Sequence, residues 1–201
     1  MKERSIYRQL ERPWLYRLSQ TLLAPGNQKA IMNRIGKLLT HLPPATRILD
    51  VGCGPSSWLW QAGLRPIGLD LSVAYTASYN QQGGVAVTGS AAALPFSDNT
   101  FDGVWSIALL HHLPDDLARQ TVNEMLRVCR PHGYIAIFDA VLPEPAWHRP
   151  LAYALRRLDR GKFMRRENEL KNLLPPRESF GLERFTYTYN GLEAVLVHHA
   201  G

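Results

Sequence analysis

The sequence predicts an α/β fold in which a doubly wound, mostly parallel sheet of seven strands ends in an antiparallel hairpin at its C-terminal edge. Short apolar runs alternate with helical patterns between residues 46 and 140, an order that builds a parallel sheet covered on both faces. A Gly-x-Gly turn, Gly52 to Gly54, directly follows the first run. The pair Asn190-Gly191 separates the last two runs and is typical of a tight hairpin turn.

The strands follow from short runs of apolar, β-branched and aromatic residues bounded by turn residues. We expect them at residues 46–51, 66–69, 85–88, 101–107, 134–140, 184–189 and 193–199. The fifth run shows little alternation between apolar and polar residues, which indicates a strand buried on both faces.

The helices follow from apolar residues spaced three or four apart. We expect helices over 3–23 with a kink at Pro13, from the turn at 24–27 to Pro43, from Pro55 towards residue 61, over 72–80, and over 115–130. The segment 131–133 should stop the last of these. One or two basic helices are expected over 151–174, carrying Arg156, Arg157, Arg160, Lys162, Arg165 and Arg166.

The carboxyl ends of parallel strands meet at one edge of a sheet, where ligands bind. Five polar residues fall near these ends, so one crevice could collect them: Asp50, Asp70, Ser90, Ser106 and Asp139. Gly52 and Gly54 have no Cβ and can take positive φ, which allows a nucleotide or amino-acid group to lie against the main chain. Asp70 lies twenty residues after Asp50 and suits hydrogen bonding to ribose hydroxyls.

Charge is spread unevenly over the 201 residues, whose net charge is +6. Residues 1–40 carry eight Lys or Arg against two Asp or Glu, residues 41–140 carry five against eight, and residues 141–201 carry ten against seven. Basic flanks around a mildly acidic centre fit either an anionic partner or solvated helix faces.

No window is apolar enough to cross a bilayer, and the first residues lack the apolar region of a signal peptide. We therefore expect a cytoplasmic protein. The two cysteines, Cys53 and Cys129, fit a reducing compartment, and nothing in the sequence indicates a bridge between them.

The motifs, taken together, resemble those of class I S-adenosylmethionine-dependent methyltransferases. They are Ile48-Leu-Asp-Val-Gly-Cys-Gly54, Gly68-Leu-Asp-Leu-Ser72, Ala93-Leu-Pro-Phe-Ser-Asp-Asn-Thr-Phe-Asp102, the stretch from Ser106 to Leu113, and Glu124-Met-Leu-Arg-Val-Cys-Arg-Pro-His-Gly133. The resemblance covers about residues 44–140 and is closest to the small-molecule branch that includes ubiquinone and menaquinone C-methyltransferases. It implies a Rossmann-like fold and S-adenosylmethionine as cofactor.

The resemblance also implies roles for individual residues. The methionine portion would lie against Asp50, Gly52, Cys53 and Gly54, the ribose against Asp70, and the adenine against Leu71, Ser90 and Ala91. Ser106 and His111 would lie on the loop under the sulfonium. Two positions depart from the family pattern: Ser56 replaces the usual third glycine, and Ser90 replaces an aspartate that accepts from the adenine amino group.

We expect the chain to divide into four parts. These are an N-terminal helical cap (1–42), a cofactor-binding core (43–142), a basic helical insertion that forms the acceptor site (143–178), and C-terminal strands that complete the sheet (179–201).

Methyl transfer from a sulfonium depends mainly on alignment of the reactants, so no obvious catalytic dyad is required. If a general base is needed, His111 is the first candidate, because histidine accepts a proton near neutral pH. A packed or capping role competes with this one for His111 and more strongly for His112. Asp139, His148 and Tyr7 are weaker candidates.

Two other kinds of site fit the sequence poorly. A nicotinamide dehydrogenase would need a third glycine where Ser57 stands and a Tyr-x-x-x-Lys pair, but Tyr153 is followed by Arg157. A metal site is not expected, because the cysteines have no Cys-x-x-Cys partners and adjacent histidines point in different directions on a strand.

Three functions remain open. Basic amphipathic helices carrying Trp14, Tyr16, Trp147 and Tyr153 suit a small apolar or lipid-like acceptor, reached from a membrane surface. The same basic flanks could grip RNA, and residues 106–112 are similar to tRNA carboxymethyluridine methyltransferases. The departures at Ser56 and Ser90 allow a cofactor-binding protein that regulates a partner without catalysis. The oligomeric state cannot be predicted.

Overall fold

The computed structural model describes residues 27–41, 47–144, 149–157, 162–176, 178–186 and 192–200. They form one seven-stranded sheet with the order β3-β2-β1-β4-β5-β7-β6. The strands are β1 (Ile48–Val51), β2 (Ile67–Asp70), β3 (Val85–Thr88), β4 (Phe101–Ile107), β5 (Cys129–Val141), β6 (Gly181–Thr186) and β7 (Glu193–Ala200). The first five are parallel, whereas β7 runs antiparallel to both β5 and β6. The predicted fold class is confirmed.

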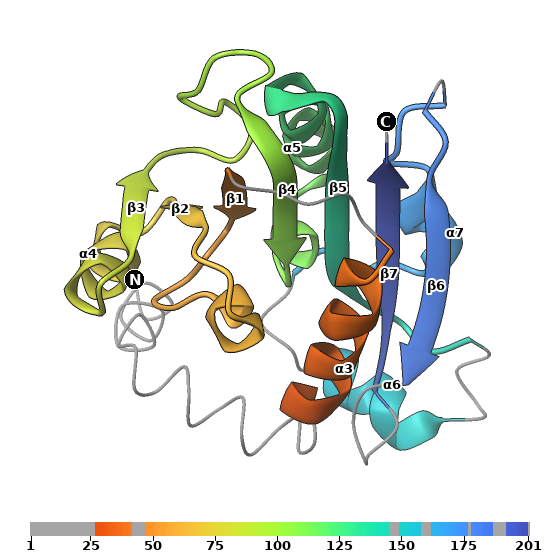
Figure 1. The fold of residues 1–201 in the computed structure, drawn as a ribbon. Coiled ribbons are helices and arrows are strands. Elements are labelled where there is room, and N and C mark those ends of the chain that lie inside the picture. The colour runs from red at the N-terminus through yellow and green to blue at the C-terminus, as the bar shows by residue number, and fades with distance from the viewer. Residues whose placement is uncertain are drawn as a thin grey trace, which may run out of the picture.

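Helices cover both faces of this sheet (Figure 1). They are α3 (Asn27–Leu39), α4 (Val73–Gln81), α5 (Asp115–Val128), α6 (Pro150–Arg157) and α7 (Glu167–Lys171), together with the 3-10 helices η1 (Trp58–Ala62) and η2 (Leu110–His112). Helix α3 lies in front of the sheet in this view and α5 lies behind it. The predicted helix over 3–23 and the Asn190-Gly191 turn lie outside the described residues.

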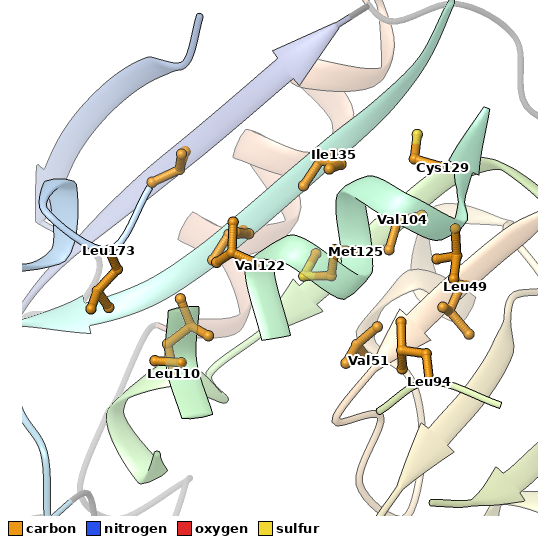
Figure 2. Packing of buried hydrophobic residues seen from close by; sticks show 14 of the residues in the cluster. Leu49, Val51, Leu94, Val104, Leu110, Val122, Met125, Cys129, Ile135 and Leu173 are labelled. Atoms are coloured by element: carbon orange, nitrogen blue, oxygen red, sulfur yellow. The ribbon is translucent and has the colours of Figure 1, made fainter. Parts of the chain in front are cut away.

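The two faces of the sheet bury separate hydrophobic clusters. One cluster joins α5 to the sheet through Val104, Val122, Met125 and Ile135, all of which are fully buried (Figure 2). The other packs α3 against the opposite face, where Ile35 lies near Trp105 and Phe138. Because strand side chains alternate between faces, neighbouring residues of β4 belong to different clusters.

The predicted α-helix from Pro55 is wrong. Residues Trp58–Ala62 form a single 3-10 segment, which begins only after Ser57 caps it by accepting from the Leu59 N–H. Gly63 ends it in the left-handed conformation at φ 79°. A segment this short has little helix dipole, so the expected attraction of a ligand to a helix N-terminus does not apply here.

The predicted end of the helix over 115–130 is also wrong in detail. Helix α5 ends at Val128, because Cys129 is already extended and pairs with Phe101. The next aligned pair is Gly103 with Tyr134, so the segment 131–133 forms a bulge within β5 and does not stop a helix. His132 takes a positive φ of 65° in this bulge.

The basic segment 151–174 contains two helices, α6 and α7, separated by residues that are not helical where they are described. Arg165 was expected on a basic helix, but it lies in an extended stretch that bridges to Val141 and is only 5% exposed. None of the described helices is long and apolar enough to span a membrane.

Tyr134 and Trp105 pack against each other across β4 and β5. The rings meet edge to face at a centroid distance of 5.9 Å, and the Trp105 Nε1–H donates to Tyr134 Oη at 3.1 Å. Gly103 makes room for the Tyr134 ring, since a Cβ there would lie 2.6 Å from Tyr134 Cζ. The close approach explains a glycine in the middle of a buried strand.

Replacing Gly103 with Ala should lower the free energy of unfolding by about 1–3 kcal/mol, because the added methyl group forces the Tyr134 ring out of its packed position. Gly36→Ala is the control: a Cβ there meets nothing within 4 Å, and alanine favours the helix by about 0.5–1 kcal/mol. Urea unfolding of both variants measures the difference. Equal stabilities would contradict the packing described.

Candidate functional site

Polar side chains stand at the carboxyl ends of four adjacent parallel strands. In the order of the strands across the sheet, they are Asp70 at the end of β2, Asp50 in β1, Ser106 in β4 and Asp139 in β5. Asp50, Ser106 and Asp139 are at most 2% exposed. The strand order places these four residues at one edge of the sheet, as the sequence predicted, and Ser90 follows β3 at the same edge.

The glycine turn after β1 is held against the end of β2 by its own backbone. Gly52 and Gly54 have φ of 76° and 62°, as expected for a turn that other residues adopt only with strain. The Gly52 and Cys53 amides both donate to Leu69 O, at 2.7 and 3.0 Å. The next amide, of Gly54, donates to Asp70 Oδ2 at 3.0 Å, so three successive N–H groups fix the turn.

The Asp70 carboxylate connects two loops. Its Oδ2 accepts from Gly54 and its Oδ1 accepts from the Ser72 N–H at 2.9 Å, at the start of α4. Burial raises its pKa, and these backbone hydrogen bonds oppose the rise. Each carboxylate oxygen can accept a second hydrogen bond, so the oriented carboxylate can still receive two hydroxyl donors from a ligand.

Asp50 is a buried carboxyl group with one side-chain donor. Ser57 Oγ donates to Asp50 Oδ2 at 2.5 Å. Burial raises the pKa of Asp50 to about 6, the Ser57 hydrogen bond lowers it in part, and the charge of Asp70 raises it further. Two neighbouring carboxylates favour a positively charged ligand.

The other residues expected around the cofactor lie in different environments. The Cys53 side chain packs on Gly68, where an added Cβ would lie 2.6 Å from Cys53 Sγ, and burial raises the pKa of this thiol. Leu71 is 76% exposed beside Asp70. Ser90 is exposed and accepts from the Ala92 N–H at 3.3 Å, while Ala91 packs on the core.

The chain turns sharply after β4. Ala108 takes a positive φ of 60°, which costs a residue with a Cβ about 1–2 kcal/mol, and its N–H donates to Phe138 O at 2.8 Å. The turn places Leu109 over the glycine loop, where a Cβ on Gly52 would lie 2.9 Å from Leu109 Cδ1. Backbone strain of this kind is concentrated at functional sites.

The same turn brings His111 to Asp139. His111 Nδ1 is in hydrogen-bond contact with Asp139 Oδ1, and both side chains are buried. The Ala140 N–H donates to the same carboxylate oxygen at 2.8 Å. Asp139 Oδ2 and Ser106 Oγ are buried without a hydrogen-bond partner among the described residues.

Arg165 connects the segment 162–166 to the His111 loop. Its guanidinium donates to Leu110 O at 2.8 Å, to Leu113 O at 2.7 Å and to Asp115 Oδ1 at 2.7 Å. The Phe163 N–H donates to His111 O at 3.1 Å. Residues 162–166 therefore lie directly beside the His111 loop.

Sequence reasoning ranked Asp139 as a weak candidate base and did not foresee its contact with His111. It also missed the contacts of Arg165 and Leu109 and the hydrogen bond from Ser57 to Asp50.

The remaining candidate bases are His112, Tyr7 and His148. His112 is exposed, and the centroid of its ring lies 4.2 Å from that of the His111 ring. Tyr7 and His148 lie outside the described residues. Within the described part of the chain, no group of three or more His, Cys, Asp or Glu side chains could hold a metal.

The fold and the edge define a class of protein: a Rossmann-like α/β protein whose glycine turn and strand-end carboxylates suit a nucleoside ligand with positive charge. Residues 49–137 match the family described as methyltransferase domain. The match runs from β1 to β5 and so contains the glycine turn, Asp70 and His111.

Two curated relatives of the chain are named as methyltransferases. The chain is 33% identical over 109 residues to tRNA (carboxymethyluridine(34)-5-O)-methyltransferase of Arabidopsis thaliana, which covers 52% of this chain and 26% of that protein. It is 31% identical over 123 residues to demethylmenaquinone methyltransferase of Listeria monocytogenes, covering 54% and 51%. The chain spans about a quarter to a half of the length of these two relatives.

A solved structure shows the fold over nearly the whole chain. A methyltransferase of Thermotoga maritima, described as a possible histamine N-methyltransferase, superposes with a TM-score of 0.74 at 15% identity, covering 96% of this chain and 99% of that one. The matched domain over residues 49–137 and the shared fold together support a class I S-adenosylmethionine-dependent methyltransferase.

The burial of Asp50 predicts a specific pH dependence of stability. Between the ordinary pKa of 3.8 and about 6, the folded chain keeps a proton that the unfolded chain has lost, so stability falls as the pH rises through this window. Asp50→Asn removes this effect. The stability of wild type relative to this variant should fall by about 3 kcal/mol between pH 3.5 and 7, measured by urea unfolding.

Ser57→Ala is the companion variant. Because the Ser57 hydrogen bond lowers the pKa of Asp50, its removal should extend the loss of stability to higher pH. A difference between wild type and Asp50→Asn that stays constant with pH would show that Asp50 is not the buried titrating group.

Proposed function

We propose that the chain transfers a methyl group from S-adenosylmethionine to a small, apolar or lipid-like metabolite. The observation that carries the proposal is the fixed Asp70 carboxylate, which lies between the glycine turn and the exposed Leu71. A carboxylate with spare acceptor capacity suits the two ribose hydroxyls, and an exposed leucine beside it offers an apolar surface for adenine.

The residues present fit S-adenosylmethionine in charge as well as in shape. A Cβ on Gly54 would meet nothing within 4 Å, so the turn is open on that side. Asp50 and Asp70 together favour a cationic ligand, and the donor carries both an ammonium and a sulfonium group. When bound, the donor supplies an electrophilic methyl group, and the chain supplies alignment. Gly52, Gly54 and Asp50 would hold the methionine portion, and Ser90 and Ala91 would border the adenine.

The described arginines of residues 143–178 support a small acceptor over RNA. Three of them are paired with carboxylates: Arg149 with Glu193, Arg165 with Asp115, and Arg166 with Glu144. Arg184, in β6, is paired with Glu167 and Glu193. Paired cations contribute less to binding phosphates than free ones do. Phe163, which is 39% exposed and next to the His111 loop in space, offers apolar surface to an acceptor.

A tRNA acceptor is the second candidate, favoured by the 33% identity to the Arabidopsis enzyme. A protein that only binds the cofactor is the third, because Ser56 and Ser90 depart from the family pattern. The first two functions differ in the molecule that becomes methylated, and under the third function no molecule is methylated.

Asp70→Ala should weaken S-adenosylmethionine binding by about 10- to 100-fold, because hydrogen bonds to a charged group contribute about 1.5–3 kcal/mol. Isothermal titration calorimetry measures the two affinities. Asp116→Ala, at an exposed position in the first turn of α5, is the matched control and should bind as wild type does. Equal affinity of Asp70→Ala and wild type would count against the cofactor assignment.

Incubation of the protein with a cell extract and a radiolabelled methyl donor identifies the acceptor class. The extract is divided into small-molecule, lipid and RNA fractions. We expect label in the small-molecule or lipid fraction, because the described arginines of the insertion are paired. Label in RNA alone would establish the tRNA candidate, and donor binding without label in any fraction would favour the non-catalytic one.

A further inference from the structure

The contact between His111 and Asp139 assigns different tasks to the two ring nitrogens. Asp139 Oδ1 faces Nδ1, and an ionised carboxylate only accepts hydrogen bonds, so it favours the tautomer with the proton on Nδ1. The lone pair then lies on Nε2, where a proton can be accepted. Asp139 is held in place in turn by the Ala140 N–H, which donates to the same oxygen.

Two buried polar atoms near this pair have no partner among the described residues. They are Asp139 Oδ2 and Ser106 Oγ. Ser106 aligns with Ile137, two residues before Asp139 on the neighbouring strand, so both side chains project from the same face of the sheet. A buried polar group without a hydrogen bond costs about 1–3 kcal/mol, a cost that a ligand with a hydrogen-bond donor would offset.

The pair of His111 and Asp139 lies on the opposite side of β4 from the glycine turn. Asp50 and Asp70 lie on β1 and β2, on one side of β4, and Asp139 lies on β5, on the other side. The loop after β4 joins the two groups, because Leu109 rests on Gly52 and His111 contacts Asp139. A methyl donor at the glycine turn and an acceptor at His111 would therefore meet above the end of β4.

We propose that His111 is a general base oriented by Asp139 and that the acceptor presents a weakly acidic hydroxyl of the phenol class. This inference rests on the proposed function and narrows its substrate. His111 is the catalytic residue, and Asp139 is a positioning residue that acts through it. A carboxylate or a tertiary amine acceptor carries no proton to remove and would make no use of this pair.

The acceptor oxygen forms a bond to the methyl carbon as the bond between that carbon and the sulfonium sulfur breaks, and the electron pair of the broken bond stays on sulfur. The hydroxyl proton passes to His111 Nε2. The products are a methyl ether, a neutral thioether and an imidazolium that faces the Asp139 carboxylate, and the proton then leaves to solvent.

A first experiment needs neither donor nor acceptor. The ¹⁵N NMR signals of the His111 ring, assigned by their loss in His111→Gln, report which nitrogen carries the proton. Wild type should show the Nδ1–H tautomer, and Asp139→Asn should shift the population towards Nε2–H, because an amide can donate to Nδ1. The same tautomer in both proteins would overturn the role of Asp139.

A second experiment uses para-substituted phenols from 4-methylphenol to 4-nitrophenol as acceptors. For 4-methylphenol, Asp139→Asn and His111→Gln should each lower kcat by roughly 10²- to 10⁴-fold with little change in KM. The loss should shrink towards 4-nitrophenol, which is already ionised at the assay pH. Asp116→Asn, a change from carboxylate to amide at an exposed position, should match wild type.

The outcomes separate this inference from the proposed function. An equal loss for every phenol would show a purely structural role for the pair, and wild type that binds the donor but methylates no phenol would overturn the acceptor class while keeping the methyltransferase assignment. Wild type that does not bind S-adenosylmethionine would overturn both. If Asp139→Asn does not fold, as circular dichroism would show, His111→Gln gives the same test of the base.

Discussion

Three successive backbone amides, of Gly52, Cys53 and Gly54, donate to the end of β2, and the site depends on these bonds. These bonds occupy the N–H groups of the turn, so those groups are not available to a ligand. The turn can bind a ligand through the space that its glycines leave and through the carboxylates beside it. The same bonds also fix Asp70, since Gly54 donates to its side chain. The positive φ of both glycines is the local cost of this arrangement, and residues with a Cβ would add strain there.

Burial then gives the site its electrostatic character. Asp50 and Asp70 lie at the ends of adjacent strands, and burial raises the pKa of both. A ligand that brings positive charge to this place stabilises the ionised carboxylates, whereas a neutral one does not. For the proposed reaction, the donor is cationic at sulfur and the product is not. The same charges that hold the donor therefore hold its product less tightly, which favours exchange after each turnover.

Local signals predicted much of the fold. Strands β3 and β4 were predicted with the bounds observed, and α4 begins after Ser72, whose side chain accepts from the Tyr75 N–H as a cap should. The strand-end residues were predicted because the carboxyl ends of parallel strands meet at one edge. The errors arose where tertiary contacts decide. Cys129 leaves the helix to pair with Phe101, and Arg165 leaves a helical pattern to bind the loop at Leu110 and Leu113. The contact of His111 with Asp139 depends on the positive φ of Ala108, an alanine that no sequence pattern marks.

Strand β4 divides the carboxyl edge of the sheet into two halves. The matched family region ends at residue 137, two residues before Asp139 and well before the segment around Arg165 that lies beside the His111 loop. The matched region contains the glycine turn, Asp70 and His111, whereas Asp139 and Arg165 lie beyond its end. The carboxylate that contacts His111 is therefore supplied by a part of the chain that the matched domain does not reach.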